Sequence, residues 1–159
     1  MVSACLLGIG CRYDGRHSLC PGLVEALPPP LFIPFCPEQL GGLPTPRPPA
    51  NLKNGDGQDV LAGLARIINA EGKDVTEAFK KGAHEALRLA RLTGILVAIM
   101  KDRSPSCGLR TAFCDKSMGR GIGVTAALFE SEGIKIIELG SNDVFPSQEF
   151  WELMNKVYE

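Results

Sequence analysis

The sequence predicts a single small Rossmann-like α/β domain, with a mostly parallel sheet and helices on both faces. Its first sign is a set of short apolar runs that are continuous rather than alternating, at residues 2–7, 31–36, 95–100 and 135–139. Such runs are typical of strands that are buried on both faces. The second sign is that segments with a helical pattern precede the last two runs. Strands that alternate with crossover helices build a parallel sheet with helices on each face.

The segment DVTEAFKKGAHEALRLARLTG, residues 74–94, predicts a helix between the second and third runs. Asp74 and Glu77 form a variant of the capping box at its start, and Gly94 supplies the stop. One apolar stripe is expected to face the core, and it consists of Phe79, Ala83, Ala86, Leu87 and Ala90.

Two further helices and one long loop complete the expected order of elements. Residues 121–133, GIGVTAALFESEG, favour a helix that ends at Gly133, directly before the fourth run. A last helix is expected to start from Ser147. Residues 44–57 contain four prolines and suit neither a helix nor a central strand, so we expect a long loop there.

Composition and charge limit the kinds of partner. The 159 residues fit one domain, 1–159, with a net charge of -1, which provides no field to attract nucleic acid or an anionic membrane. The chain lacks any apolar stretch of the roughly 20 residues that a bilayer span needs, and its first residues lack the basic flank of a secretory signal. We therefore expect a cytoplasmic protein without a membrane or large nucleic acid as partner, and the oligomeric state stays open.

The six cysteines are expected to be reduced thiols or metal ligands, because the chain is large enough to fold without disulfides and carries no export signal. Cys5 lies toward the end of the first run, Cys36 closes the second, and Cys107 lies in the loop after the third. Ligands bind outside the carboxyl ends of parallel strands, so these three thiols are expected to meet at one edge of the sheet. We interpret Cys11, Cys20 and Cys114 as small buried hydrophobic residues or incidental thiols.

Residues next to these cysteines add candidate chemistry. Glu38 follows Cys36 by two residues and precedes a pair of glycines that lets the backbone approach a ligand. Pro105 and the glycine after Cys107 hold Ser104 and the thiol in one rigid loop. The alternatives are that Glu38 is a solvated surface acid and that Ser104 caps a short turn.

Six motifs together resemble the family long known as domain of unknown function 523, which includes the 2-thiouracil desulfurases. They run from about residue 3 to residue 134 and read SACLLG, RYDG, CPEQLGGLPTPR, GKDVTEAFKKGA, KDRSPSCG and GVTAALFESEGI. The combination is more specific for the domain than for the substrate. This resemblance implies an enzyme, and the absence of the fused domain that some relatives carry favours a stand-alone one.

The resemblance implies a [4Fe-4S] cluster bound by Cys5, Cys36 and Cys107, with the fourth iron free of protein ligands. It further implies a non-redox reaction in which the thiocarbonyl sulfur of the substrate binds that iron and water replaces it, so that sulfide leaves. The proton transfers would fall to Glu38 and Ser104.

For Asp14, Arg47 and Lys101, which lie in or near the family motifs, the expected role is to orient a heterocycle or to support the loops. Asp14 and Gly15 equally suit a simple turn. Cys20 matches no family motif. The expected substrate is a small thiolated heterocycle, such as thiouracil or a thiolated tRNA base or its breakdown product.

Two other functions compete with the desulfurase. The same cysteines could bind zinc or an inert cluster in a structural or sulfur-sensing protein, with Cys11 or Glu38 as the fourth zinc ligand. A thiol redox pair of Cys107 and Cys114 is disfavoured, because their spacing is far from the C-x-x-C arrangement that tunes such pairs.

Overall fold

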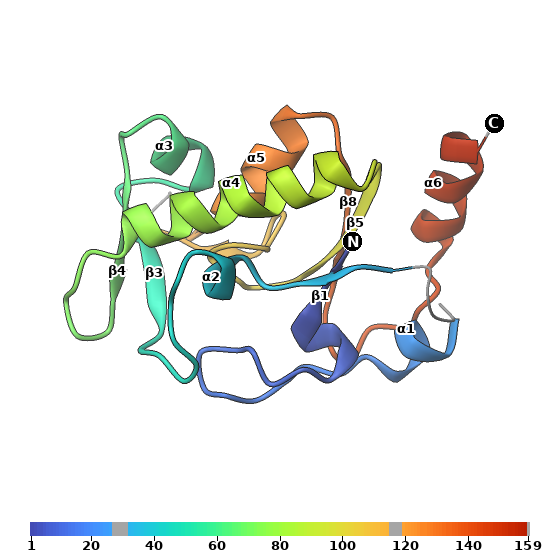
Figure 1. Cartoon of the computed structure of the whole chain (residues 1–159), viewed down its shortest axis with the longest axis horizontal. Helices are drawn as coiled ribbons and strands as arrows, with labels where there is room; N and C mark the ends of the chain where they lie inside the picture. The colour runs from blue at the N-terminus through green and yellow to red at the C-terminus, as the bar shows by residue number, and fades with distance from the viewer. Residues whose placement is uncertain (27–31, 115–118, 159) are drawn as a thin grey trace.

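The central sheet has four parallel strands in the order β2-β1-β5-β8. The structure is a computed structural model that describes residues 1–26, 32–114 and 119–158 (Figure 1). The strands of this sheet are β1 (Val2–Ser3), β2 (Pro34–Phe35), β5 (Val97–Lys101) and β8 (Lys135–Leu139). β1, β2 and β8 lie within three of the predicted apolar runs, and β5 extends one residue beyond the fourth, to Lys101. The predicted parallel pairing is confirmed.

The strand β1 is shorter than its apolar run. It ends at Ser3, and residues Ala4–Leu7 form a 3-10 helix, η1. Gly8 then adopts a positive φ of 88°, which reverses the chain. In the second run, Leu31 lies outside the described residues, and Pro34 and Phe35 form the strand.

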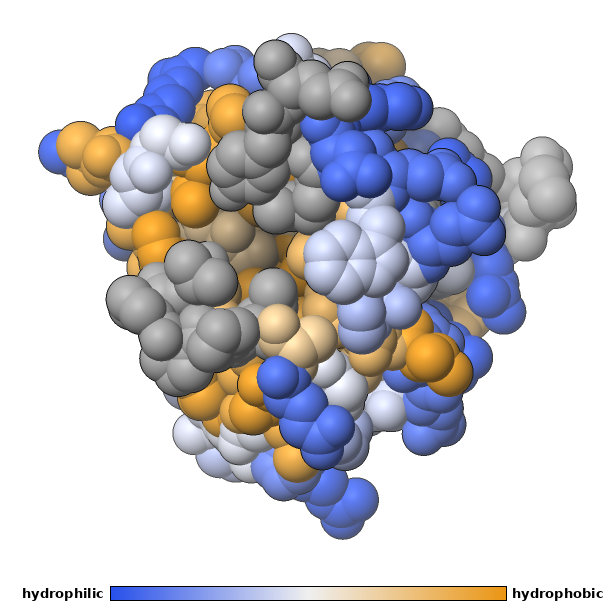
Figure 2. All heavy atoms as spheres, turned by 90° about the vertical axis from the view of Figure 1, so that its right-hand side faces the viewer, coloured by the Kyte–Doolittle hydropathy of each residue, from blue (hydrophilic) through white to orange (hydrophobic). Residues whose placement is uncertain are grey.

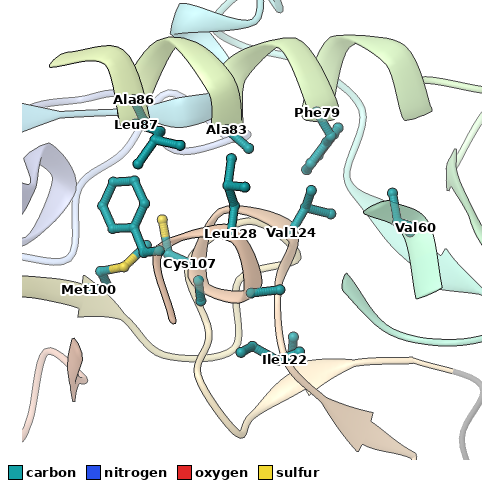
Figure 3. Close-up of a cluster of buried hydrophobic side chains, with 14 of the residues drawn as sticks. Val60, Phe79, Ala83, Ala86, Leu87, Met100, Cys107, Ile122, Val124 and Leu128 are labelled. Atoms are coloured by element: carbon teal, nitrogen blue, oxygen red, sulfur yellow. The ribbon is translucent and has the colours of Figure 1, made fainter. Parts of the chain in front are cut away.

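Helices cover both faces of the sheet, as the sequence predicts (Figure 1). They are α1 (Pro21–Ala26), α2 (Pro37–Leu40), α3 (Gly57–Leu61), α4 (Thr76–Leu92), α5 (Val124–Ser131) and α6 (Gln148–Tyr158). Along β5, Met100 packs into the apolar cluster formed with α4 and α5, where Phe79 and Val124 also lie (Figure 3). Its neighbour Ile99 packs into a second cluster with Leu23 of α1 and Phe150 of α6.

The predicted loop at residues 44–57 is wrong in part. Residues Ala50–Lys53 form β3, which pairs antiparallel with β4 (Arg66–Asn69), and α3 starts at Gly57. The strand was hidden in the sequence because the buried side chain of Leu52 stands alone between polar neighbours. A second short antiparallel pair joins β6 (Ala112–Phe113) to β7 (Arg120–Gly121).

The side of the molecule that carries α1 and α6 exposes apolar as well as hydrophilic side chains (Figure 2). Trp151 and Val144 are exposed, whereas Phe150 is buried against Phe145. Within the described ranges, no helix combines the length and the apolar character that crossing a bilayer requires.

The start of α4 matches the predicted capping box only on one side. The Asp74 carboxylate accepts a hydrogen bond of 2.9 Å from the Thr76 N–H. Glu77 instead forms an exposed ion pair with Lys80 at 3.2 Å. The Thr76 hydroxyl accepts a hydrogen bond from the Ile67 N–H, which fastens the first turn of the helix to β4.

Asp74 is expected to stabilise the start of α4 in a pH-dependent way. Hydrogen bonds from the Thr76 hydroxyl and N–H lower the pKa of Asp74. The stabilisation is therefore present at neutral pH and is lost as the pH falls through the folded-state pKa. At neutral pH, Asp74→Ala should lower the free energy of unfolding by about 0.5–1 kcal/mol, measured by urea denaturation. In acid the loss should shrink.

The matched control is Glu77→Ala, which removes a carboxylate from the same turn. Its ion pair with Lys80 is exposed, so the expected loss is close to zero. A loss in Asp74→Ala that does not change as the pH falls would contradict the assignment.

Candidate metal centre

A cavity of about 520 Å³ lies at the carboxyl ends of β1, β2 and β5. The chain passes from β1 to β2 on one side and then crosses to β5 on the other, so the loops that follow β1 and β5 diverge. A parallel sheet binds its ligands at such a reversal of strand order. Cys5, Cys36 and Cys107 all line this cavity, so the structure brings together the three thiols that the sequence places at strand ends.

Cys5 lies in η1 rather than on the strand itself. Its carbonyl accepts hydrogen bonds from the N–H groups of Gly8 and Ser18, at 3.3 and 2.8 Å, which fasten the next segment of chain to this turn. The side chain is buried among residues of the α1 and α6 cluster. The thiol is thus carried by a short, tightly bonded turn at the end of β1.

Cys36 is positioned by the close crossing of α2 and α4. It is the N-cap residue of α2, and Pro37 occupies the first helical position, which suits its fixed φ. Two glycines allow the crossing: a Cβ added to Gly41 would lie 2.0 Å from the Ala78 carbonyl oxygen, and one added to Gly82 would lie 1.9 Å from that of Pro37. Close packing of α2 on α4 therefore sets the position of Cys36.

Cys107 lies in a loop that is bonded to the start of α5. The N–H groups of Val124 and Thr125 donate to the carbonyls of Pro105 and Ser106, both at 2.9 Å. These carbonyls satisfy helix N–H groups that would otherwise lack partners. The Cys107 side chain itself backs onto the apolar cluster beneath α4 (Figure 3). Hydrogen bonds from the start of α5 therefore constrain this loop in addition to Pro105.

Ser104 caps a turn, as one of its two interpretations predicts, and it also lines the cavity. Its hydroxyl oxygen accepts hydrogen bonds from the N–H groups of Ser106 and Cys107, at 3.2 and 3.0 Å, so it does cap a turn. The same hydroxyl lines the cavity and lies close enough to the Cys107 thiol to oppose the rise in the pKa of Cys107 that burial causes. It is therefore fixed beside the reactive space.

Ser3 is a site residue that the sequence reasoning missed. It is buried at the end of β1, lines the cavity and accepts a 3.1 Å hydrogen bond from the Lys101 N–H. Its hydroxyl also lies close enough to the Cys107 thiol to oppose the rise in the pKa of Cys107 that burial causes. The available signal was a hydroxyl residue inside an otherwise apolar run.

Cys11 lies nearer the site than its main interpretation predicts. The sequence reasoning treats it as an incidental buried thiol and, only in the zinc alternative, as a fourth ligand; it is 2 % exposed and lines the same cavity. The Cys36 thiol lies 3.8 Å from the Cys11 carbonyl oxygen, and Cys36 and Cys5 both influence the pKa of the Cys11 thiol. By contrast, Cys20 and Cys114 are buried outside the cavity lining. A signal existed in the sequence, because Cys11 belongs to the same segment as Cys5.

Glu38 and Arg47 form an ion pair at the cavity wall, with 2.6 Å between Oε2 and Nε. Their side chains are 14 % and 5 % exposed, so Glu38 is not the solvated surface acid of the alternative interpretation. Burial raises the pKa of Glu38, and Arg47 opposes that rise. Burial and the Arg47 guanidinium therefore shift the pKa of the Glu38 carboxyl group in opposite directions.

The guanidinium of Arg47 is directed toward the protein. Besides Glu38, it donates to the carbonyls of Pro44 and Cys11, at 3.2 and 3.0 Å, and to the Thr45 hydroxyl. Of the two roles expected for this residue, these contacts match loop support. Arg47 joins α2, the loop that follows it and the segment of Cys11.

Lys101 and Asp14 differ in their relation to the cavity. Lys101 lines it, and its ammonium group is paired with the Asp102 carboxylate. Asp14 is not part of the lining; its carboxylate accepts from the Arg16 N–H at 3.0 Å and pairs with Arg12, beside a positive φ at Gly15. The turn interpretation of Asp14 therefore matches its geometry.

The donor set of the cavity suits an iron–sulfur cluster. Thiolates are soft ligands that favour such clusters. Among the described residues, the thiols surround a cavity and do not converge on one point as the ligands of a single ion do. Burial raises the pKa of Cys107 to about 12, and hydrogen bonding with Cys11, followed by burial, raises that of Cys36. Binding of a cluster would thus release protons from these thiols.

Fold and site together define a parallel α/β protein with a thiol-lined centre for a metal cluster. Comparison with known proteins agrees with this class. The family model described as 2-thiouracil desulfurase matches residues 1–139. The protein YbbK of Bacillus subtilis (strain 168), described as uncharacterized, is 40% identical over 148 residues, which cover 91% of this chain and 98% of YbbK.

A solved structure agrees as well. The [4Fe-4S]-dependent thiouracil desulfidase TudS superposes with a TM-score of 0.75 at 36% identity, and the match covers 96% of each chain. This chain belongs to the 2-thiouracil desulfurase family. The resemblance seen in the sequence motifs is therefore confirmed.

Gly82→Ala is expected to destabilise the protein although alanine favours helices. Its Cβ would collide with the Pro37 carbonyl, and overpacking of this kind typically costs about 1–3 kcal/mol. Urea denaturation measures the loss, and the iron content after cluster reconstitution reports whether Cys36 has moved. The control Lys81→Ala, on the exposed side of the same turn, should change the stability by less than about 0.5 kcal/mol. Wild-type stability of Gly82→Ala would refute the close crossing.

Arg47→Leu should leave Glu38 buried without its partner and lower the free energy of unfolding by about 3–5 kcal/mol. The double variant Arg47→Leu/Glu38→Gln should lose less than the sum of the two single variants, because its amide carries no charge to bury. Urea denaturation of the four proteins measures this coupling. Additive losses would show that the ion pair does not determine the stability of this region.

Proposed function

We propose that this chain is a [4Fe-4S]-dependent desulfurase that removes sulfur, as sulfide, from a small thiolated heterocycle such as 2-thiouracil. In this proposal Cys5, Cys36 and Cys107 bind the cluster. One observation carries it: three thiols from the ends of three parallel strands meet in a single cavity that Glu38 and Ser104 also line. Membership of the family and the similarity to a [4Fe-4S]-dependent thiouracil desulfidase support the same activity.

Three protein ligands suit a catalytic centre better than a structural one. A metal site that performs chemistry leaves one coordination position free of protein, whereas structural sites are closed. When bound, the cluster would supply a Lewis-acidic iron with affinity for the soft sulfur of a thiocarbonyl group. The substrate ring would then lie in the remaining cavity, between the cluster ligands and Glu38.

Replacement of sulfur by the oxygen of water requires proton transfer but no electrons. A thiocarbonyl and water give a carbonyl and hydrogen sulfide, so two protons leave the water oxygen and end on sulfur. Glu38 is suited to accept and return a proton, because its carboxyl group is buried and Arg47 keeps it oriented at 2.6 Å. The Ser104 hydroxyl, fixed by the backbone of its own loop, is placed to hydrogen-bond to the attacking water or the ring.

Other cavity residues favour a flat, uncharged ligand. Tyr13 and Phe113 line the cavity and are each partly exposed, so an aromatic ring can pack on them. Lys101 is paired with Asp102, which lowers its attraction for anions. A direct role of Lys101, Arg47 or Asp14 in binding the heterocycle remains a prediction, as do the cytoplasmic location, the single-domain organisation and the lack of a large nucleic-acid partner.

Iron and sulfide analysis after anaerobic reconstitution tests the cluster. We expect about four irons and four sulfides per chain, as a [4Fe-4S] centre requires, and their loss in Cys5→Ala, Cys36→Ala and Cys107→Ala. Sulfide release from 2-thiouracil then tests catalysis. A colourless protein with one bound zinc would refute the proposal.

The variant Glu38→Gln separates catalysis from cluster storage. It should keep its iron and sulfide but lose activity by a factor of about 10²–10⁴, the usual contribution of a general acid–base group. The control Glu85→Gln changes an exposed carboxylate on α4 and should retain full activity. Unchanged activity in Glu38→Gln would remove Glu38 from the mechanism, and absent activity in a wild-type protein with a complete cluster would favour a sensor or structural role.

A further inference from the structure

Four thiols, and not three, surround the cavity. Cys11 lines it together with Cys5, Cys36 and Cys107. The Cys36 thiol lies 3.8 Å from the carbonyl oxygen of Cys11, and Cys36 and Cys5 both influence the pKa of the Cys11 thiol. A cubane cluster has four irons, and the proposed ligands Cys5, Cys36 and Cys107 bind three of them. The fourth thiol, that of Cys11, has no partner in this scheme. The extra thiol lies among the ligands and not elsewhere in the core.

The backbone of Cys11 is fixed from several sides. Its N–H donates to the Ile9 carbonyl at 2.8 Å, and its own carbonyl accepts from Arg47 at 3.0 Å. The Cys36 sulfur lies 3.8 Å from the same carbonyl oxygen. Since Arg47 also binds Glu38, the contacts that position the proposed proton-transfer group position Cys11 as well.

Cys20 and Cys114, the other two buried cysteines outside the proposed ligand set, provide a comparison for Cys11. Cys20 is 1 % exposed and does not line the cavity, although its sulfur lies 3.7 Å from the carbonyl oxygen of Asp143, which does. Cys114 is buried directly after β6 and does not line the cavity either. Cys11 is equally buried and belongs to the same apolar cluster as Cys20, but it lines the cavity, which Cys20 does not.

We propose that Cys11 is a reversible fourth ligand of the cluster, an inference that rests on the proposed function. Its thiolate binds the open iron when no substrate is present and is displaced by the thiocarbonyl sulfur. In that exchange one iron–sulfur bond to Cys11 breaks and one to the substrate forms, and the released thiolate takes up a proton from water. No electrons are transferred. The closed resting state protects an iron that otherwise faces a cavity open to solvent.

The test compares wild type, Cys11→Ala and the control Cys20→Ala after anaerobic reconstitution with ⁵⁷Fe. All three should contain about four irons per chain. Without substrate, Mössbauer spectra should show sulfur coordination of every iron in wild type and Cys20→Ala. One iron in Cys11→Ala should instead show oxygen or nitrogen coordination. Cys11→Ser, which preserves the size of the side chain, serves if the alanine variant does not fold.

Two further measurements follow from an unprotected iron. Mild oxidation should convert Cys11→Ala to the three-iron form, detected by EPR, about tenfold or more faster than wild type, the scale on which loss of a metal-site residue changes metal affinity. Titration with 2-thiouracil, followed by the visible absorption of the cluster, should show tighter binding to Cys11→Ala, because an internal competitor has been removed. Cys20→Ala should match wild type in both.

The outcomes separate this inference from the proposed function. Spectra, oxidation rate and thiouracil affinity equal to those of wild type would show that Cys11 is a bystander. Complete loss of the cluster in both Cys11→Ala and Cys11→Ser would make it an obligatory ligand and overturn its reversibility. A wild-type protein that binds no cluster would refute the proposed function itself, and this inference with it.

Discussion

The ion pair between Glu38 and Arg47 is the contact on which the geometry of the centre depends. Arg47 also donates to the carbonyls of Cys11 and Pro44, so a single side chain joins α2, the proline-rich loop after it and the segment that follows η1. A buried carboxylate without a cation would be protonated or would draw water into the cavity. Arg47 therefore stabilises the carboxylate of Glu38, the proposed proton-transfer group, beside a thiol-lined space.

Helix packing places the remaining parts of the centre. The crossing at Gly41 and Gly82 brings α2 against α4 so closely that a methyl group on either residue would overlap with backbone. The loop of Cys107 is fastened from the opposite direction, because its carbonyls accept hydrogen bonds from the start of α5. Cys36 and Cys107 thus reach one cavity because α4 and α5 cover the same face of the sheet (Figure 1).

A non-redox desulfurase makes particular demands that this arrangement meets. It needs soft ligands that bind a cluster without closing it, a group that moves protons without ligating iron, and a cavity beside both. Thiols from three strand ends, a carboxylate turned toward Arg47 and a hydroxyl fixed by its own loop correspond to these needs. The additional thiol of Cys11 suggests how such an open centre stays intact between substrates.

The sequence alone determined the strand runs, the helices from Thr76 and Val124, and the prediction that Cys5, Cys36 and Cys107 share one edge, because periodicity, caps and strand ends are local properties of the chain. It did not reveal β3, whose buried Leu52 has polar neighbours, or the place of Cys11 in the cavity. Only the tertiary structure decided that Arg47 faces Glu38 and that Asp14 lies in a turn. The physical reason is that no periodic pattern marks which of several possible partners a charged side chain meets: Arg47 reaches Glu38 across a loop and Cys11 from a more distant segment, and the cavity wall forms only when these segments pack together.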